Sequence, residues 1–293
     1  MSGFVSARLA APFMRAAAIL ALALPLLALP GGQGVRAQTA EAAGDMARDT
    51  SMRPSEAWDE IRGDVVGEGE LLDGAGLFAL EAPFRAEDAA TVPVRLVQKE
   101  GTARIAKLTL VIDENPAPVA AVFTFGPAMA PLDLETRVRV NAYSNIRAIA
   151  ETEDGALHMV GAYVRASGGC SAPASKDAEA ALAALGQMKA RWYEQEPAAS
   201  GTRRTAQVML RHPNYSGLQR DQITHLFVPA WFIDTVEVRR GEEMLFRMEG
   251  GISISEDPTF RFRYVDSGVG EALSVEAHDT DGGSFEGSFP LGS

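Results

Sequence analysis

The sequence between residues 136 and 164 reads TRVRVNAYSNIRAIAETEDGALHMVGAYV. Its first eight residues alternate strictly between polar and apolar side chains, which is typical of a half-buried β-strand. Two further β-rich runs, 146–152 and 156–164, flank Glu153-Asp154-Gly155, which is a tight-turn signal. This stretch therefore predicts an antiparallel hairpin and a mainly β fold.

The residues that precede this stretch are also mostly β-rich. Apolar runs at 92–97, 107–112 and 120–125 predict strands, and Asn115-Pro116-Ala117-Pro118 separates the last two of them. Upstream of these strands, Ser55 and the following six residues have the pattern of one short helix. We expect a first β domain over residues 55–173.

The residues after the hairpin show a change of period. Between 176 and 194, apolar residues recur at helical spacing without an internal proline, which predicts one amphipathic helix. This helix lies in a linker, 174–202, before a second β domain, 203–293. Glycine-containing turns in that domain separate seven expected strands, at 205–210, 222–228, 232–239, 243–248, 259–265, 273–277 and 283–289. The expected architecture is two antiparallel β-sandwiches joined by one α-helix.

The N-terminus has the pattern of a secretory signal peptide. Two arginines precede an apolar run at 16–29, and Val35-Arg36-Ala37 is a small-residue cleavage pattern. A membrane anchor is the alternative, but two prolines interrupt the run, which is shorter than the ~20 residues that a bilayer span needs. We expect a cleaved signal peptide over 1–37, a flexible leader over 38–54 and a periplasmic product.

Composition limits the partners. Removal of residues 1–37 takes away three arginines and no acids, so the formal net charge goes from −12 to −15. A strongly acidic protein is a poor ligand for nucleic acid or for anionic membrane surfaces.

The chain contains a single cysteine, in the segment Gly168-Gly169-Cys170-Ser171-Ala172-Pro173. A lone thiol in an exported protein is either buried and inert or used in intermolecular sulfur chemistry. Two glycines before it and small residues after it favour an exposed, mobile segment. A helix that begins soon afterwards would favour the thiolate through its dipole. We therefore expect Cys170 to be accessible, more acidic than an ordinary cysteine, rapidly labelled, and able to form Cys170-linked dimers of an otherwise monomeric protein.

The sequence gives little indication of metal binding, cofactor binding or acid–base catalysis. The four histidines are not spaced as metal ligands, and there is no Cys-x-x-Cys pair or phosphate-binding glycine loop, so we expect no metal and no cofactor. His158 could form a nucleophilic pair with Cys170, but it fits a strand surface better. His212 is expected in a loop. Arg261 and Arg263 alternate with aromatic residues, which fits a half-buried strand better than an anion site.

Several segments carry a family resemblance. The first β region resembles SoxY, the sulfur-substrate carrier of thiosulfate oxidation, and the second resembles its partner SoxZ. The SoxY-like segments are 90–94, 114–120, 125–127, 137–144 and the Gly-Gly-Cys, and the SoxZ-like segments are 212–213, 229–233, 240–242, 253–258 and 279–283. In order, they resemble a fused SoxYZ-like carrier of the type associated with quinoprotein dehydrogenases.

The resemblance implies a fold and a function. It implies that 55–173 is a SoxY-like domain, that 203–293 is a SoxZ-like domain, and that both are immunoglobulin-like sandwiches. It also implies that Cys170 carries a covalent sulfur-containing substrate, with Gly168, Gly169 and Ser171 as its tether, and presents it to periplasmic redox enzymes. On this interpretation the protein has no catalytic residues of its own.

One departure from the family pattern leaves a second function class open. The dedicated carrier ends in a Gly-Gly-Cys-Gly-Gly arm, whereas Cys170 is internal and glycines only precede it. The rival hypothesis is a binding or assembly module for a secreted quinoprotein dehydrogenase, in which the cysteine is incidental. Replacement of Cys170 by serine would abolish the first function and spare the second. An independent cysteine hydrolase is a distant third, because no strong base accompanies the thiol.

Overall fold

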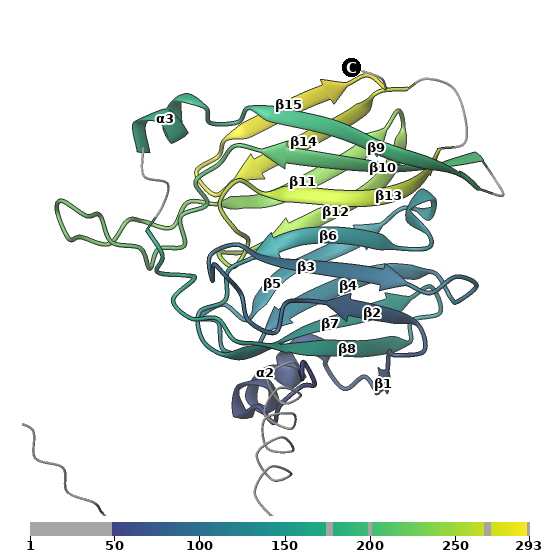
Figure 1. The fold of residues 1–293 in the computed structure, drawn as a ribbon, viewed down its shortest axis with the longest axis horizontal. Coiled ribbons are helices and arrows are strands. Elements are labelled where there is room, and N and C mark those ends of the chain that lie inside the picture. The colour runs from purple at the N-terminus through teal and green to yellow at the C-terminus, as the bar shows by residue number, and fades with distance from the viewer. Residues whose placement is uncertain (1–48, 174–177, 199–200, 267–270, 292–293) are drawn as a thin grey trace, which may run out of the picture. The chain divides into compact units, whose positions relative to one another are not determined.

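The computed structural model describes residues 49–173, 178–198, 201–266 and 271–291, and most regular elements in these ranges are β-strands (Figure 1). The expected signal peptide, 1–37, and most of the expected leader, 38–54, lie outside the described residues. We call residues 49–173 the N-terminal half and residues 178–291 the C-terminal half.

Each half contributes its elements in an order close to the one expected. The N-terminal half contains α2 (Glu56–Val66), β1 (Leu71–Asp73), β2 (Phe78–Glu81), β3 (Val92–Gln98), β4 (Ile105–Ile112), β5 (Val119–Phe125), the 3-10 turn η1 (Pro127–Met129), β6 (Asp133–Val138), β7 (Ser144–Thr152) and β8 (Leu157–Val164). The C-terminal half contains α3 (Ala178–Ala183), β9 (Met188–Ala198), β10 (Gly201–Leu210), β11 (Ile233–Arg240), β12 (Glu243–Gly250), β13 (Thr259–Asp266), β14 (Leu273–Asp279) and β15 (Ser284–Phe289).

The strands form two sheets, and both sheets run through both halves. One sheet has the order β1-β8-β7-β4-β5-β12-β11-β14-β15, and the other has the order β2-β3-β6-β13-β10-β9. The halves join where β5 pairs with β12 and β6 pairs with β13, both antiparallel. The mainly β sandwich architecture is therefore confirmed, and strand pairing makes the two sandwiches continuous.

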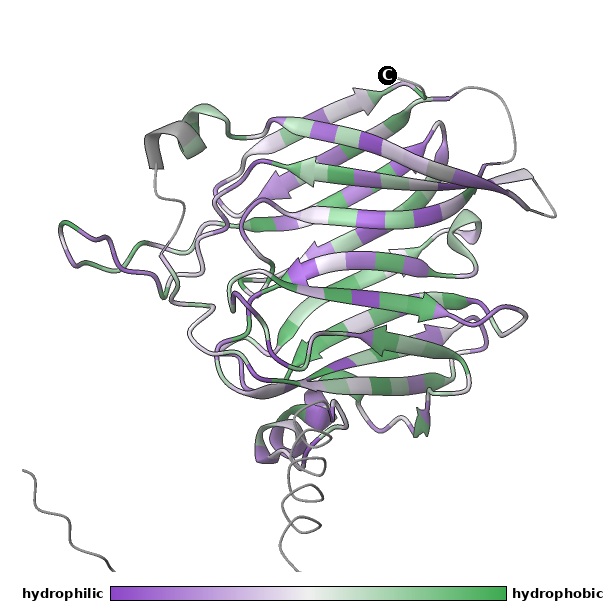
Figure 2. Ribbon diagram, in the orientation of Figure 1, coloured by the Kyte–Doolittle hydropathy of each residue, from purple (hydrophilic) through white to green (hydrophobic). Residues whose placement is uncertain are grey.

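Apolar and polar residues alternate along many of the strands, as the green and purple bands in Figure 2 show, and the buried apolar residues form one core across this junction. Phe123 of β5 contacts Phe246 of β12 and Phe260 of β13, each with ring centroids 6.4 Å apart. All three rings are fully buried and belong to a single apolar cluster that includes residues of both halves. Because the two halves share this cluster, separating them would expose aromatic surface to water.

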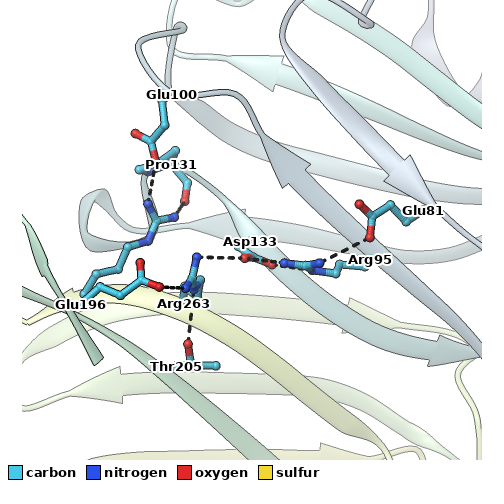
Figure 3. Close-up of polar contacts among 9 residues, drawn as sticks. Glu81, Arg95, Glu100, Pro131, Asp133, Glu196, Thr205 and Arg263 are labelled. Carbon is cyan, nitrogen blue, oxygen red and sulfur yellow. Dashed lines mark hydrogen bonds and ion pairs between the residues drawn. The ribbon is translucent and has the colours of Figure 1, made fainter. Parts of the chain in front are cut away.

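Ion pairs reinforce the junction on the outer face of the six-stranded sheet (Figure 3). Asp133 of β6 accepts two hydrogen bonds of 2.9 Å from Arg95 of β3, and it lies 3.7 Å from Arg263 of β13. Arg263 also pairs with Glu196 of β9 at 2.8 Å. These arginines line an open hollow of about 480 Å³, but their charges are already balanced by acids. Arg263 lies half-buried in β13, which confirms the expected half-buried strand at this position.

The expected short helix is present as α2, and one buried aromatic residue attaches it to the sheet. Ser55 caps its N-terminus by accepting a hydrogen bond from the Trp58 amide at 3.2 Å. The Trp58 ring stacks on the Arg147 guanidinium of β7, with 4.5 Å between the guanidinium carbon and the ring centroid. Arg147 is in turn held by Asp113 at 2.8 Å.

Two expectations for secondary structure in the C-terminal half are wrong. The helix expected over 176–194 is limited to the six residues of α3, and residues 188–198 form strand β9. In 188–193, even-numbered residues are half-buried and odd-numbered residues are exposed, which is the period of two of a β-strand. Pairing with β10 stabilises this strand conformation over the helix that the apolar spacing predicts. The strand expected at 222–228 is a loop, in which the apolar side chains Ile223, Leu226 and Phe227 are exposed.

Candidate functional site

Cys170 lies in a tight segment that follows β8 and packs against the N-terminal half. The amides of Gly168 and Gly169 donate to the carbonyls of Asn141 and Val140 at 2.8 and 3.0 Å, and the Ser171 amide donates to the Gly168 carbonyl at 3.2 Å. The Cys170 side chain has 0% exposure. The expectation of an exposed thiol on a mobile tip is therefore wrong for this conformation.

The two glycines explain why the segment is closed. A Cβ on Gly169 would lie 2.1 Å from the Ala89 carbonyl oxygen and 2.7 Å from that of Val140, so only glycine allows this close approach. Gly168 has φ +79°, a conformation that other residues adopt at a cost. The Gly-Gly pair, expected to act as a tether, instead makes close packing possible, and Ser171 closes the turn by donating from its hydroxyl to the Gly168 carbonyl at 3.2 Å.

The C-terminal half covers the other side of the cysteine. We call residues 214–232 the cap loop; it is the long green loop that projects at the left of Figure 1. The Ser216 hydroxyl donates to the Cys170 carbonyl, and the Gln219 side-chain amide donates to the Ala172 carbonyl at 3.0 Å. Bridges between Tyr215 and Trp231, and between Arg220 and Phe227, hold the two sides of the loop together. Cys170 is thus enclosed at the junction of the two halves.

Burial also reverses the expected acidity of the thiol. Removal from water raises the pKa of Cys170 from its ordinary value of 9.0 to about 11, while the positive charge of Arg139 acts in the opposite direction. The expected activation by a helix dipole is absent, because α3 has only six residues and begins eight positions after the cysteine. In the closed form the thiol is therefore covered from solvent and stays protonated at neutral pH.

Arg139 is the charged group of this site. Its side chain is 1% exposed, and its two terminal nitrogens donate to the carbonyls of Gly169 and Asn214, each at 3.2 Å. It thereby connects the cysteine segment with the cap loop. Sequence reasoning missed this residue because the alternation at 136–143 places Arg139 on the same strand face as Arg137. In the structure β6 ends at Val138, and the break in the strand turns Arg139 into the interior.

His212 is buried at the base of the cap loop, and its hydrogen bonds join it to Asn214 and Asp279. Its Nδ1 accepts a hydrogen bond from the backbone amide of Asn214 at 3.0 Å, and its Nε2 lies 3.4 Å from the Asp279 carboxylate. Desolvation lowers the pKa of this imidazole, while hydrogen bonds to Asn214 and Asp279 oppose that effect. Its ring packs edge to face against the Trp231 ring, with 4.9 Å between the ring centroids. His212 therefore anchors the loop.

The other histidine considered as a partner is placed elsewhere. His158 lies in β8 opposite Ala150 of β7 and Leu72 of β1. Within the described ranges no histidine hydrogen-bonds to Cys170, and the structure gives no support to a Cys-His pair. Among the same residues, no group of three or more His, Cys, Asp or Glu side chains is placed to hold a metal ion.

A groove of about 320 Å³ opens beside the cysteine segment. It is lined by Ser171, Pro173, Leu218, Arg220, Asp221, Gln222 and His225. The tip of the cap loop beside this groove exposes Ile223, Leu226 and Phe227 by 89%, 69% and 57%. A partner that docks on this apolar tip would lie next to the segment that encloses Cys170.

These features define a two-part β-sandwich protein with one enclosed thiol at the junction of its halves. Comparison with protein families matches residues 62–170 to the sulfur oxidation protein SoxY and residues 191–290 to the sulphur oxidation protein SoxZ. The chain therefore belongs to the SoxYZ-like proteins, with a SoxY domain fused to a SoxZ domain. The SoxY match ends on Cys170.

Comparison with solved structures gives similarity over about one third of the chain. The sulfur carrier protein SoxY from Chlorobium limicola f thiosulfatophilum is 22% identical, with a TM-score of 0.32, over 37% of this chain and 94% of that chain. Superoxide reductase (neelaredoxin) from Ignicoccus hospitalis is 16% identical, with a TM-score of 0.27, over 36% of this chain and 90% of that chain. No curated protein sequence matches the chain. Of the helices that the structure describes, none is long and apolar enough to cross a membrane.

Proposed function

We propose that this chain is a periplasmic carrier protein, without turnover of its own, that holds a sulfur-containing substrate covalently on Cys170. The observation that carries this proposal is the position of the chain's single cysteine at the end of the SoxY match and at its junction with the SoxZ domain. A thiol at a junction of two domains becomes accessible when either domain's loop moves. Partner redox enzymes would receive the substrate in mixed-disulfide or thiosulfonate linkage.

The enclosed conformation gives the carrier a closed state. Exposure of the sulfur requires loss of the hydrogen bonds from Ser216 and Gln219 to the cysteine segment. These two bonds, together with the one that Arg139 donates to the Asn214 carbonyl of the cap loop, contribute about 2.5–6 kcal/mol, which a docked partner can supply on binding. The apolar tip of the cap loop, next to this segment, is the surface where we expect that partner to bind.

Intact-mass analysis tests the carrier function directly. The protein is purified from the periplasm of its own cells without reductant, in parallel with the Cys170→Ser variant. We expect the wild type to carry an adduct mass that reductant removes, and the variant to carry none and to lose carrier function. Unmodified wild-type protein from active cells, together with full function of the variant, would exclude the carrier role. Recovery of peptides from residues 16–29 in the same material would contradict export by cleavage.

The second candidate function is a binding or assembly module for a secreted quinoprotein dehydrogenase. The exposed tip of the cap loop favours it, because three large apolar side chains on a loop are typical of an interaction site. On this hypothesis Cys170→Ser retains partner binding and activity. A triple variant with serine at Ile223, Leu226 and Phe227 loses both. A carrier predicts that each variant abolishes substrate transfer.

A further inference from the structure

Arg139 is buried in the interior of the protein and forms no ion pair with a described residue. Its side chain is 1% exposed, and its hydrogen-bond acceptors are two neutral carbonyls, those of Gly169 and Asn214. Its Nε is buried and has no partner among the described residues. No ion pair joins the guanidinium to a described carboxylate, although the charges of Glu256 and Asp88 act on it, that of Glu256 more strongly than the Cys170 sulfur. Buried arginines are ordinarily paired with an anion, because an isolated charge is costly to remove from water.

The group that could balance this charge is on the neighbouring segment. Arg139 donates to the carbonyl of Gly169, the residue before Cys170, and its charge and the Cys170 sulfur interact electrostatically. In the closed form the thiol is neutral, so the arginine lacks a counter-ion there. A negative charge on the sulfur, or on a group attached to it, would supply one.

We propose that Arg139 is the anion-binding residue of the Cys170 site and that it selects negatively charged species at the sulfur. This inference rests on the proposed carrier function, which it extends by assigning a binding residue. A purely structural role, in which Arg139 only ties the cysteine segment to the cap loop, requires the two carbonyl contacts but does not require a charge preference at the sulfur.

Competition between two thiol reagents separates these roles. The reagents are 2-sulfonatoethyl methanethiosulfonate, which is an anion, and 2-aminoethyl methanethiosulfonate, which is a cation. In each case the Cys170 thiolate attacks the sulfenyl sulfur, a disulfide forms, the S–S bond of the reagent breaks, methanesulfinate leaves, and the thiol proton goes to solvent. The ratio of the two products in intact mass reports the charge felt at the sulfur, because both reagents depend on the same opening of the site.

The expected preference for the anionic reagent is opposite to the preference that the net charge of the protein predicts. With a formal net charge of −12, the surface should favour the cationic reagent. A guanidinium hydrogen-bonded to the residue before Cys170 should instead shift the ratio about tenfold toward the anion, relative to the same protein in urea. Equal ratios in folded and urea-unfolded wild type would overturn the proposal, and this comparison needs no variant.

Variants assign the effect to one residue. Arg139→Gln should lose the anion preference and Arg139→Lys should keep it. Arg137→Gln is the matched control, because it removes the same charge two residues away at an exposed position. Arg220→Gln tests the arginine of the groove beside the cysteine segment. If the preference disappears in Arg220→Gln and persists in Arg139→Gln, Arg139 is not the anion-binding residue.

The neutral reagent methyl methanethiosulfonate keeps this test independent of the carrier function. Its reaction with folded wild-type protein shows that the site opens, whatever the charge preference. A charge-independent ratio together with this reaction would overturn only the role of Arg139. Failure of all three reagents to modify folded protein would show that the site does not open without a partner and would overturn the charge selection proposed for Arg139, while the carrier function is tested separately by the intact mass of periplasmic protein.

Discussion

Gly169 is the residue on which the enclosure of Cys170 most directly depends, and alanine substitution tests this. Gly169→Ala should lower the free energy of unfolding by about 3 kcal/mol, because its Cβ would overlap the carbonyl oxygens of Ala89 and Val140. A Cβ at Gly168 would contact only the Ser171 hydroxyl oxygen, at 4.0 Å, but φ stays at +79°, so the expected cost of Gly168→Ala is about 1–2 kcal/mol. Gly76→Ala, which meets no atom within 4 Å, is the control. Urea unfolding measures all three, and equal effects at 168 and 169 would contradict the close approach.

The Cys170 thiol gives a second prediction at the residue scale, a pH dependence. Because the folded pKa is raised to about 11, the folded state favours the neutral thiol. This contribution to stability is fully present below pH 9 and is lost as the pH rises through 11. Labelling by iodoacetamide in native protein should therefore continue to accelerate up to about pH 11, whereas in urea it should level off near pH 9.

A direct comparison of the two rates completes this test. At pH 8, native labelling should be slower than labelling in urea. Cys170→Ser is the blank, since the chain has no other cysteine. Parallel pH profiles in the two states would show that the sulfur is solvated in the folded protein.

Among the secondary-structure elements, α2 is held to the sheet largely through Trp58, which is 6% exposed and packs on Val111 and Ile149. Trp58→Ala should cost about 3 kcal/mol, because it removes a buried indole and leaves the Arg147 guanidinium without its stacked ring. Glu60→Ala, at an exposed position of the same helix, should change stability by less than about 0.5 kcal/mol. Limited proteolysis within α2 would detect release of the helix, and unchanged protection in Trp58→Ala would contradict this anchoring.

The cap loop shows why an apolar run need not form a strand. The Asp221 side chain accepts hydrogen bonds from the amides of Ile223 and Thr224, at 3.1 and 2.7 Å, and so fixes a turn at the start of the run. The sequence 222–228 has the composition of a strand, but no described strand lies beside it to supply a ladder. Its side chains therefore remain exposed at the tip.

For the whole molecule, the pairing of β5 with β12 and of β6 with β13 predicts that the halves stay together after the chain is cut. A specific protease site is inserted between residues 173 and 178 and cleaved in the folded protein. The two fragments should elute as one species in size-exclusion chromatography and in native mass spectrometry, because they share buried aromatic contacts.

A substitution at the junction provides the control for this experiment. Phe246→Asp places a charge against Phe123 and Phe260 and should cause the cut fragments to separate. Immediate dissociation of the cut wild-type protein would show that the linker, rather than the core, holds the halves together.

Local patterns determined much of this fold. Period-two alternation located most strands, the 153–155 turn is confirmed by Gly155 with φ +84°, and the family segments predicted the order of the two domains. These features are set by residues close to one another in the chain, so the sequence alone is sufficient to predict them.

Tertiary contacts decided the rest. Strand β9 forms because β10 lies beside it. Arg139 is buried because β6 ends at Val138. Gly169 allows the cysteine segment to pack directly against the carbonyls of Ala89 and Val140. Cys170 is covered by a loop from the other domain, 46 residues farther along the chain at Ser216. A sequence shows that a glycine can be flexible, but the neighbours that fill the space around it come from distant segments. Whether Cys170 is exposed or enclosed was therefore determined only by the packing of one domain against the other.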